Sequence, residues 1–231
     1  MLGATLPREQ DAHMRNPIIQ HASIRAAKAT DAEQIAAIYD PVVRDSVISF
    51  ELEPPTPADM QRRMHAIANS GLPWLVCVCD GAVLGYAYAS RHRERLAYRW
   101  SVDVSVYVTE SARKRGIGTS LYSALLAILS IQRFQNAYAG ITLPNPASEA
   151  LHGALGFVHI GTYTRVGFKL GEWRDVAWYG RTLGEHETPP LQPIPVSELI
   201  GSQLWNSALA TAAERIRPSS SAEFVQEFDM K

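Results

Sequence analysis

The feature that most constrains the fold is a strand that passes through a glycine-bearing turn into a helix, between Trp100 and Leu121. Valines at positions 102, 104, 106 and 108 alternate with other residues, and this period of two predicts a β-strand. Apolar residues then recur at helical spacing from Ile117 to Leu129. The first N–H groups of a helix have no intrahelical partner and lie at the positive end of the helix dipole. The turn is therefore a candidate phosphate-binding site.

The turn itself, from Arg113 to Gly118, has the form R-x-x-G-x-G. It is neither the P-loop, which needs G-x-x-x-x-G-K-[S/T], nor the dinucleotide fingerprint, which needs G-x-G-x-x-G. Its glycines let a ligand approach the backbone without a Cβ in the way. The alternative is an ordinary helix start with a basic, solvated first turn, and the rest of the chain has to decide between the two.

Composition argues against several classes of protein. The 231 residues carry a net charge of −1, which does not favour nucleic acid or an acidic membrane surface as a partner. No apolar stretch approaches the length of a membrane span, and the N-terminus lacks the apolar core of a signal peptide. Cys77 and Cys79 would point to the same face of one strand, which suits buried thiols rather than a disulfide or a zinc site. We therefore expect a soluble, cytoplasmic protein without a metal.

The order of predicted elements indicates one mixed α/β domain with an extension at each end. We expect an N-terminal extension over residues 1–22, the domain over residues 23–183, and a proline-rich strap with a partly ordered tail over residues 184–231. A capping box of Thr30 and Glu33 would start the first helix, Thr56 would cap the second, and Asp80-Gly81 would form a tight hairpin. Strands are expected at residues 23–27, 72–79, 82–90, 98–108, 137–143, 158–168 and 173–183, and the later helices at residues 116–134 and 147–155.

Short motifs are spread through the domain in a fixed order. They are Pro73-Trp74-Leu75-Val76, Ala97-Tyr98-Arg99-Trp100-Ser101, Ser105-Val106-Tyr107-Val108, Arg113–Gly118, Leu143-Pro144-Asn145, Leu151-His152-x-x-Leu155-Gly156-Phe157 and Gly167-Phe168-Lys169-x-Gly171-x-Trp173-x-Asp175-Val176. In this order and spacing they resemble the phosphinothricin and methionine-sulfoximine N-acetyltransferases, a subfamily of the GNAT acetyltransferases. The resemblance implies the layered α/β fold of that family. Its sheet is mixed and mostly antiparallel with helices on both faces, and two parallel strands splay apart to admit acetyl-CoA.

The resemblance also implies how acetyl-CoA would be held as a co-substrate. Backbone groups at the end of the valine strand would bind the pantetheine arm as an added strand would. The basic turn would cradle the pyrophosphate. Asn145 would bond the pantetheine near the thioester, with Ser148 as a further candidate. The implied cofactor-binding residues are Val106, Tyr107, Val108, Arg113, Lys114, Arg115, Gly116, Ile117, Gly118, Thr119, Asn145 and Ser148.

Asp103 is the implied catalytic residue. The resembled subfamily has a glutamate three residues after the Trp-Ser pair, and this chain has the shorter aspartate there. Its carboxylate would take a proton from the acceptor ammonium, directly or through a water, because only the free amine attacks the thioester. The alternative is a structural role, in which Asp103 caps an element or pairs with an arginine.

The acceptor pocket is implied less directly. Arg93 and Arg95, with Arg99 nearby, would bind the carboxylate of an amino acid, since a guanidinium meets a carboxylate with two bonds. The alternative is a solvated basic loop or non-specific contact with nucleic acid. Phe50, Tyr107 and His152 match acceptor-pocket positions of the family, and His152 could instead be a hydrogen-bonded helix histidine.

The implied function is acetyl-CoA-dependent N-acetylation of a small amino acid or analogue, of the phosphinothricin or methionine-sulfoximine kind. The amine would attack directly in a ternary complex, without a covalent cysteine, in an enzyme that is a homodimer. One alternative is a GNAT enzyme with another amine acceptor, such as a protein N-terminus or a polyamine. Arg93 and Arg95 argue against a polyamine by charge repulsion. The other alternative is a non-catalytic acyl-CoA sensor, which the aspartate at position 103 keeps open.

Overall fold

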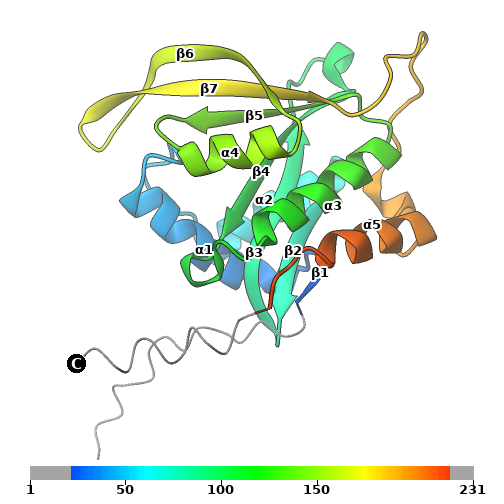
Figure 1. Cartoon of the computed structure of the whole chain (residues 1–231), viewed down its shortest axis with the longest axis horizontal. Helices are drawn as coiled ribbons and strands as arrows, with labels where there is room; N and C mark the ends of the chain where they lie inside the picture. The colour runs from blue at the N-terminus through cyan, green and yellow to red at the C-terminus, as the bar shows by residue number, and fades with distance from the viewer. Residues whose placement is uncertain (1–21, 219–231) are drawn as a thin grey trace, which may run out of the picture.

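The computed structural model describes residues 22–218 (Figure 1). The expected N-terminal extension as far as residue 21 and the tail beyond residue 218 lie outside the described residues. The strands are β1 (Ser23–Ala26), β2 (Trp74–Cys79), β3 (Ala82–Arg91), β4 (Ser101–Val108), β5 (Asn136–Thr142), β6 (Val158–Lys169) and β7 (Glu172–Thr182). The α-helices are α1 (Ala32–Asp45), α2 (Pro57–Asn69), α3 (Ile117–Ile131), α4 (Pro146–Ala154) and α5 (Gln203–Ala213).

The strands form one sheet in the order β1-β2-β3-β4-β5-β7-β6. β4 and β5 run parallel, and the other neighbours run antiparallel. Asp80 and Gly81 join β2 to β3 with positive φ angles of 49° and 81°, as a type I′ hairpin requires. The mixed, mostly antiparallel sheet with its helices confirms the fold class expected from the sequence.

β4 and β5 pair briefly and then separate. Their last paired residues are Asp103 and Tyr138. Beyond this point β4 stays paired with β3 as far as Val108, and β5 stays paired with β7 as far as Thr142. Because each strand keeps its other neighbour, the two halves of the sheet diverge and leave a gap between β4 and β5. This is the splayed pair of parallel strands that the resemblance implied.

Helices cover both faces of the sheet (Figure 1). α1 and α2 pack on one face, in a buried cluster that includes Met60 and Tyr86, and Tyr107 of β4 packs against that cluster. α3 and α5 pack on the other face, where the valines at positions 102 and 104 are buried. Since successive side chains of a strand point to opposite faces, Asp103 lies on the α1 face with Tyr107.

The start of α1 differs from the expected capping box of Thr30 and Glu33. The N-cap residue is Asp31, and its carboxylate accepts hydrogen bonds from the Lys28 N–H at 2.7 Å and from the Arg25 guanidinium at 2.7 and 2.8 Å. The expectation is wrong because an ion pair with β1, which a local motif does not reveal, fixes Asp31 as the organising residue.

The start of α2 follows the expectation. The Thr56 hydroxyl accepts a hydrogen bond from the Asp59 N–H, the Asp59 carboxylate accepts one from the Thr56 N–H, and Pro57 occupies the first turn. This reciprocal pair satisfies two helix-end donors, so the predicted N-cap at Thr56 is confirmed.

The tail that we expected to be partly ordered packs on the domain as far as residue 218. α5 lies against α3 and β1, and its Trp205 and Leu209 are buried, with 4% and 9% exposure, in the same cluster as α3. A helix face through Leu199, Leu204 and Leu209 is not the buried one, because Leu204 is 59% exposed. The buried face is centred instead on Trp205, one residue later.

Candidate active site

The basic turn before α3 contains two residues in the left-handed conformation. Lys114 has φ 62°, and Gly116, the N-cap residue of α3, has φ 82°. Such alternation of backbone conformations makes a concave nest of N–H groups that binds anions. Within residues 22–218, no side chain caps the helix at Gly116. The N–H groups of Ile117 and Gly118 are therefore available to a phosphate, as the sequence led us to expect.

The turn adjoins the gap between β4 and β5. A Cβ on Gly118 would lie 3.7 Å from a methyl of Val108 on β4 and 3.6 Å from a methyl of Leu151 on α4. A cavity of about 60 Å³ fills the gap and reaches from Ile48 on the α1 side to Tyr122 on the α3 side. Predicted site residues that line it are Val106, Tyr107, Asn145, Ser148 and His152.

Asn145 lies in the loop between β5 and α4, and it is the N-cap residue of α4. Its side-chain oxygen accepts a hydrogen bond from the Ser148 N–H at 3.2 Å. An amide side chain has two N–H donors besides this oxygen, and these donors remain for a ligand in the gap. The structure thus places Asn145 where the sequence expected it and gives it a second role as a helix cap.

His152 lies on the α3 side of the gap, away from the acceptor face. Its Nδ1 donates to the Ser148 carbonyl oxygen at 2.7 Å, so its Nε2 accepts from the Tyr122 hydroxyl at 3.2 Å. The side chain is buried, and burial lowers its pKa, although the bond to Ser148 opposes this. These bonds fit the hydrogen-bonded helix histidine that the sequence left as the alternative. Since His152 also lines the gap together with Tyr107, its contact with the acceptor stays a prediction.

Asp103 lies at the last paired position before the gap, on the α1 face. Its Oδ1 is 2.7 Å from Nδ1 of His92, and the two side chains are 28% and 15% exposed. Burial raises the pKa of Asp103, while the hydrogen bond with His92 and the charge of Arg93 lower it in part. A carboxylate with a raised pKa next to an imidazole is suited to proton transfer.

His92 is the site residue that sequence reasoning missed. It follows the last residue of β3, and Ser90 is the β3 residue directly opposite Asp103. Its ring lies against Tyr138 of β5, with centroids 4.6 Å apart. It also makes an edge contact with Trp178, at 6.4 Å between centroids. Only the register of β3 on β4 could have predicted this pairing, because His92 and Asp103 are separated by a loop in the sequence.

Tyr107 and Phe50 lie on the α1 side of the sheet. The Tyr107 ring meets the edge of Tyr39 at 5.0 Å, and burial raises its pKa well above the usual range, so it stays a neutral donor. Phe50, 37% exposed, lies so close to Gly167 of β6 that no Cβ would fit there. Both predicted acceptor residues therefore border the face that carries Asp103.

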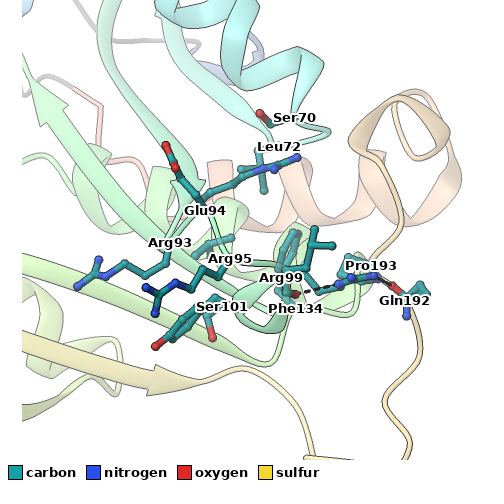
Figure 2. A pocket seen from close by; sticks show the side chains of 14 residues that line it. Ser70, Leu72, Arg93, Glu94, Arg95, Arg99, Ser101, Phe134, Gln192 and Pro193 are labelled. Carbon is teal, nitrogen blue, oxygen red and sulfur yellow. Dashed lines mark hydrogen bonds between the residues drawn. The ribbon is translucent and has the colours of Figure 1, made fainter.

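The arginines that we expected to bind the acceptor carboxylate line a second cavity of about 260 Å³ at the start of β4. Figure 2 shows Arg93, Arg95 and Arg99 on one loop, with Gln192 and Pro193 of the strap beside Arg99. Arg99 donates to Oε1 of Gln192 at 3.0 Å and to the Leu96 carbonyl, so the strap holds its side chain. Arg93 instead donates to the His92 carbonyl oxygen, and it is close enough to lower the pKa of Asp103.

Among residues 22–218, no three or more His, Cys, Asp or Glu side chains are grouped so as to hold a metal ion. Over the same residues, no helix combines the length and apolar character needed to cross a membrane. Cys77 and Cys79 are both buried and unbridged, as expected.

Comparison with known proteins gives a consistent family match. The model of the acetyltransferase (GNAT) domain matches residues 24–178. The phosphinothricin N-acetyltransferase of Streptomyces coelicolor is 39% identical over 171 residues, which are 72% of this chain and 99% of that protein. The L-methionine sulfoximine/L-methionine sulfone acetyltransferase of Pseudomonas aeruginosa is 34% identical over 170 residues, which are 73% and 99% of the two chains.

Solved structures agree with the sequence comparison. A GNAT-superfamily phosphinothricin acetyltransferase from Sinorhizobium meliloti, in complex with acetyl-CoA, matches with a TM-score of 0.70 and 40% identity and covers 75% of this chain and 93% of its own. An N-acetyltransferase from Staphylococcus aureus has a TM-score of 0.70 and 32% identity, over 71% and 100% of the two chains.

Proposed function

The chain belongs to the GNAT acetyltransferase family, and on this basis we propose that it transfers the acetyl group of acetyl-CoA to the amine of a small amino acid or amino-acid analogue. The observation that carries this proposal is the gap between β4 and β5, which opens directly beyond Asp103. It joins the phosphate-binding turn on one side of the sheet to the predicted acceptor residues on the other. A thioester in the gap would thus meet an amine beside Asp103.

The turn and the gap fit acetyl-CoA in different ways. The nest at Lys114 and Gly116, with the uncapped start of α3, suits the pyrophosphate. Among the described strands, none pairs with β4 on its β5 side from Val106 to Val108, so the backbone groups there can bond an extended pantetheine arm. Acetyl-CoA would supply the acetyl group, and these residues would hold it in the gap.

The acceptor side suits an amino acid with an acidic group. The charge of Arg93 reaches Asp103 and lowers the pKa of its carboxyl, and Arg95 lines a cavity on the same loop. A guanidinium binds a carboxylate with paired, charge-assisted bonds. The names of the relatives point the same way, because phosphinothricin and methionine sulfoximine are small amino acids with a second polar group. Asp103 would accept the proton that the ammonium must lose before it attacks.

We extend the proposal to the assembly and the location of the protein. The hairpin of β6 and β7 exposes large apolar side chains, among them Val158, Phe168 and Trp173, with 64%, 58% and 62% exposure. Exposed apolar patches of this kind mark interfaces, and a second copy of the chain would cover the patch in a homodimer. The unbridged thiols of Cys77 and Cys79 are consistent with a cytoplasmic protein.

The experiment that tests the proposal is a panel of acceptors assayed with acetyl-CoA. We expect saturable release of CoA with phosphinothricin, methionine sulfoximine and related amino acids, and slower release with spermidine or a peptide N-terminus. Faster turnover of the peptide or the polyamine would overturn the proposed acceptor class. Binding of acetyl-CoA without turnover of any amine would overturn catalysis and leave the sensor.

A further inference from the structure

We propose that His92 is the group that takes the proton from the acceptor ammonium, and that Asp103 is the residue that positions it. This inference rests on the proposed acetyl transfer and concerns the same site. It starts from the contact of 2.7 Å between Nδ1 of His92 and Oδ1 of Asp103. An ionised carboxylate only accepts hydrogen bonds, so Nδ1 carries the hydrogen and Nε2 carries the lone pair. This is the arrangement by which a carboxylate fixes the tautomer of a basic histidine.

The position of the ring supports the assignment. His92 lies over Tyr138, the β5 residue that faces Asp103 in the last pair before the gap. The imidazole is thus at the mouth of the gap, on the face that carries the acceptor residues. Aspartate is one methylene shorter than the glutamate of the resembled enzymes, and the imidazole bonded to it extends its reach. Within residues 22–218, no group is hydrogen-bonded to Nε2 of His92.

The proton balance of the reaction is closed by this pair. The acceptor ammonium gives one proton to Nε2 of His92, and the resulting imidazolium is stabilised by the Asp103 carboxylate until solvent takes the proton. The neutral amine forms a bond to the thioester carbonyl carbon, and the bond from that carbon to sulfur breaks. The second proton of the attacking nitrogen ends on the departing sulfur, which gives the amide and free CoA.

The groups around His92 come from several elements. Asp103 of β4 is the anionic neighbour, and Arg93, whose guanidinium donates to the His92 carbonyl oxygen at 2.7 Å, is the cationic one. Tyr98 and Tyr138 present their rings at 6.0 and 4.6 Å between centroids. An imidazolium formed at His92 during turnover would therefore have the Asp103 carboxylate as its direct hydrogen-bonded counterion.

The test compares the pH dependence of turnover in the parent enzyme, His92→Asn, His92→Gln, Asp103→Asn and the double variant His92→Asn with Asp103→Asn. Asparagine keeps a donor near the position of Nδ1 but cannot take a proton. We expect both His92 variants to lose about 10²–10⁴-fold in kcat, with an unchanged KM for acetyl-CoA. Their rates should recover at high pH, where solvent deprotonates the amine. The double variant should be no slower than the slower single one, because the two residues act as a unit.

Each outcome decides the inference. An active parent together with His92→Asn at the parental rate and pH profile overturns it and leaves His92 as a structural partner of Asp103. Multiplied losses in the double variant also overturn it, because they mean independent roles. A parent without turnover overturns the proposed function and this inference together. A thermal shift by acetyl-CoA equal to that of the parent verifies that each variant is folded.

A second inference comes from a separate observation, the contact of the tail with the phosphate-binding turn. The N–H of Arg217 donates to the Arg115 carbonyl oxygen at 2.9 Å, and its guanidinium donates to the Lys114 carbonyl oxygen at 2.7 Å. A Cβ on Gly116 would lie 2.6 Å from the Arg215 carbonyl oxygen. Arg215 and Arg217 lie beyond residues 24–178, the part of the chain that the family model matches.

We infer that Arg217 is a positioning residue that holds the turn in its anion-binding conformation. Lys114 is a non-glycine residue with φ 62°, and such residues keep a left-handed conformation when the surrounding structure holds them there. The tail bonds the carbonyl oxygens of the turn, which leaves the N–H groups facing the phosphate. The turn is therefore preorganised, and acetyl-CoA does not have to order it on binding.

The test measures KM for acetyl-CoA, KM for the acceptor, and kcat in Arg217→Ala and Arg217→Lys. We expect Arg217→Ala to raise KM for acetyl-CoA about tenfold and to leave KM for the acceptor unchanged. Arg62→Ala on α2 is the matched control, since it removes an exposed arginine far from the turn in the sequence. An unchanged KM for acetyl-CoA in Arg217→Ala, with a folded protein and an active parent, overturns this inference alone.

Discussion

At the scale of single residues, surroundings decide which predicted side chains can take part in chemistry. His152 matches a motif, but both of its ring nitrogens have protein partners and burial lowers its pKa. Asp103 also has a partner, but that partner is a titratable group at the mouth of the gap. The sequence alone could predict that the site uses the carboxylate of Asp103. It could not predict the imidazole, because the contact depends on the register of β3 and β4.

The role of Arg95 can be tested at this scale. If its guanidinium binds the acceptor carboxylate, Arg95→Ala loses a charge-assisted hydrogen bond worth about 1.5–3 kcal/mol. We expect KM for an acidic acceptor to rise about 10–100-fold, with KM for acetyl-CoA unchanged, in steady-state kinetics. Arg95→Lys is the control that keeps the charge and loses the fork. Equal losses for acceptors with and without a carboxylate would remove Arg95 from this role.

At the scale of elements, the start of α1 depends on one ion pair rather than on a local cap. Asp31 is 5% exposed and accepts two bonds from Arg25. Burial alone would raise the pKa of Asp31, but the hydrogen bonds from Arg25 and from the Lys28 backbone together lower it below its ordinary value. A carboxylate with a lowered pKa in the folded state stabilises that state above its unfolded pKa, and this stability is lost as pH falls through the folded pKa.

The predicted effect of Asp31→Asn on stability follows from the lowered pKa of Asp31 in the folded state. At pH 7 the variant should lose about 1.5–3 kcal/mol of unfolding free energy in urea titrations, since bonds to a charged group are lost. The difference from the parent should shrink as pH falls below about 4, where the parent loses the same ion pair. Asp40→Asn, which breaks an exposed pair with Arg44, should cost much less, because water screens the charges of exposed pairs. A difference that is constant with pH would contradict the account.

The strand, turn and helix that opened the sequence analysis can be tested as a unit through Gly118. The space for a Cβ at this residue is bounded by Val108 and Leu151 at the edge of the gap. We expect Gly118→Val to abolish the thermal stabilisation that acetyl-CoA gives the parent, which is about 2.7 kcal/mol at a hundred times its Kd. Gly153→Ala on α4, where nothing lies within 4 Å of the added carbon, should keep it. A shift of parental size in Gly118→Val would contradict the site.

At the scale of the whole molecule, most of the architecture could be predicted from periodicity and turn chemistry. Alternating valines gave β4, and Asp80-Gly81 gave the hairpin of β2 and β3. The separation of β4 from β5 could be expected only through the family resemblance, because strand pairing is not encoded locally. The packing of the tail was missed for a related reason. Its helical pattern is weak, and α5, with the buried Trp205, packs on α3 and β1, which are distant in the sequence.

The contribution of the tail to stability can be measured through Trp205. Truncation of a buried tryptophan leaves a cavity and usually costs about 3–5 kcal/mol. We expect Trp205→Ala to lower the free energy of unfolding by that amount in chemical denaturation. Leu204→Ala, on the exposed side of the same helix, should change it by less than about 0.5 kcal/mol. Equal small effects would mean that α5 is not part of the folded core.

The central claim is that this chain carries acetyl groups across the gap between β4 and β5 to a small amino acid. Its most direct test is the initial rate of CoA release from acetyl-CoA, measured with and without methionine sulfoximine, together with mass spectrometry of the product. The account predicts release that depends on the amino acid, saturates with it and yields the N-acetylated compound. Thermal stabilisation by acetyl-CoA, with no amino acid of the panel accelerating CoA release, would contradict it.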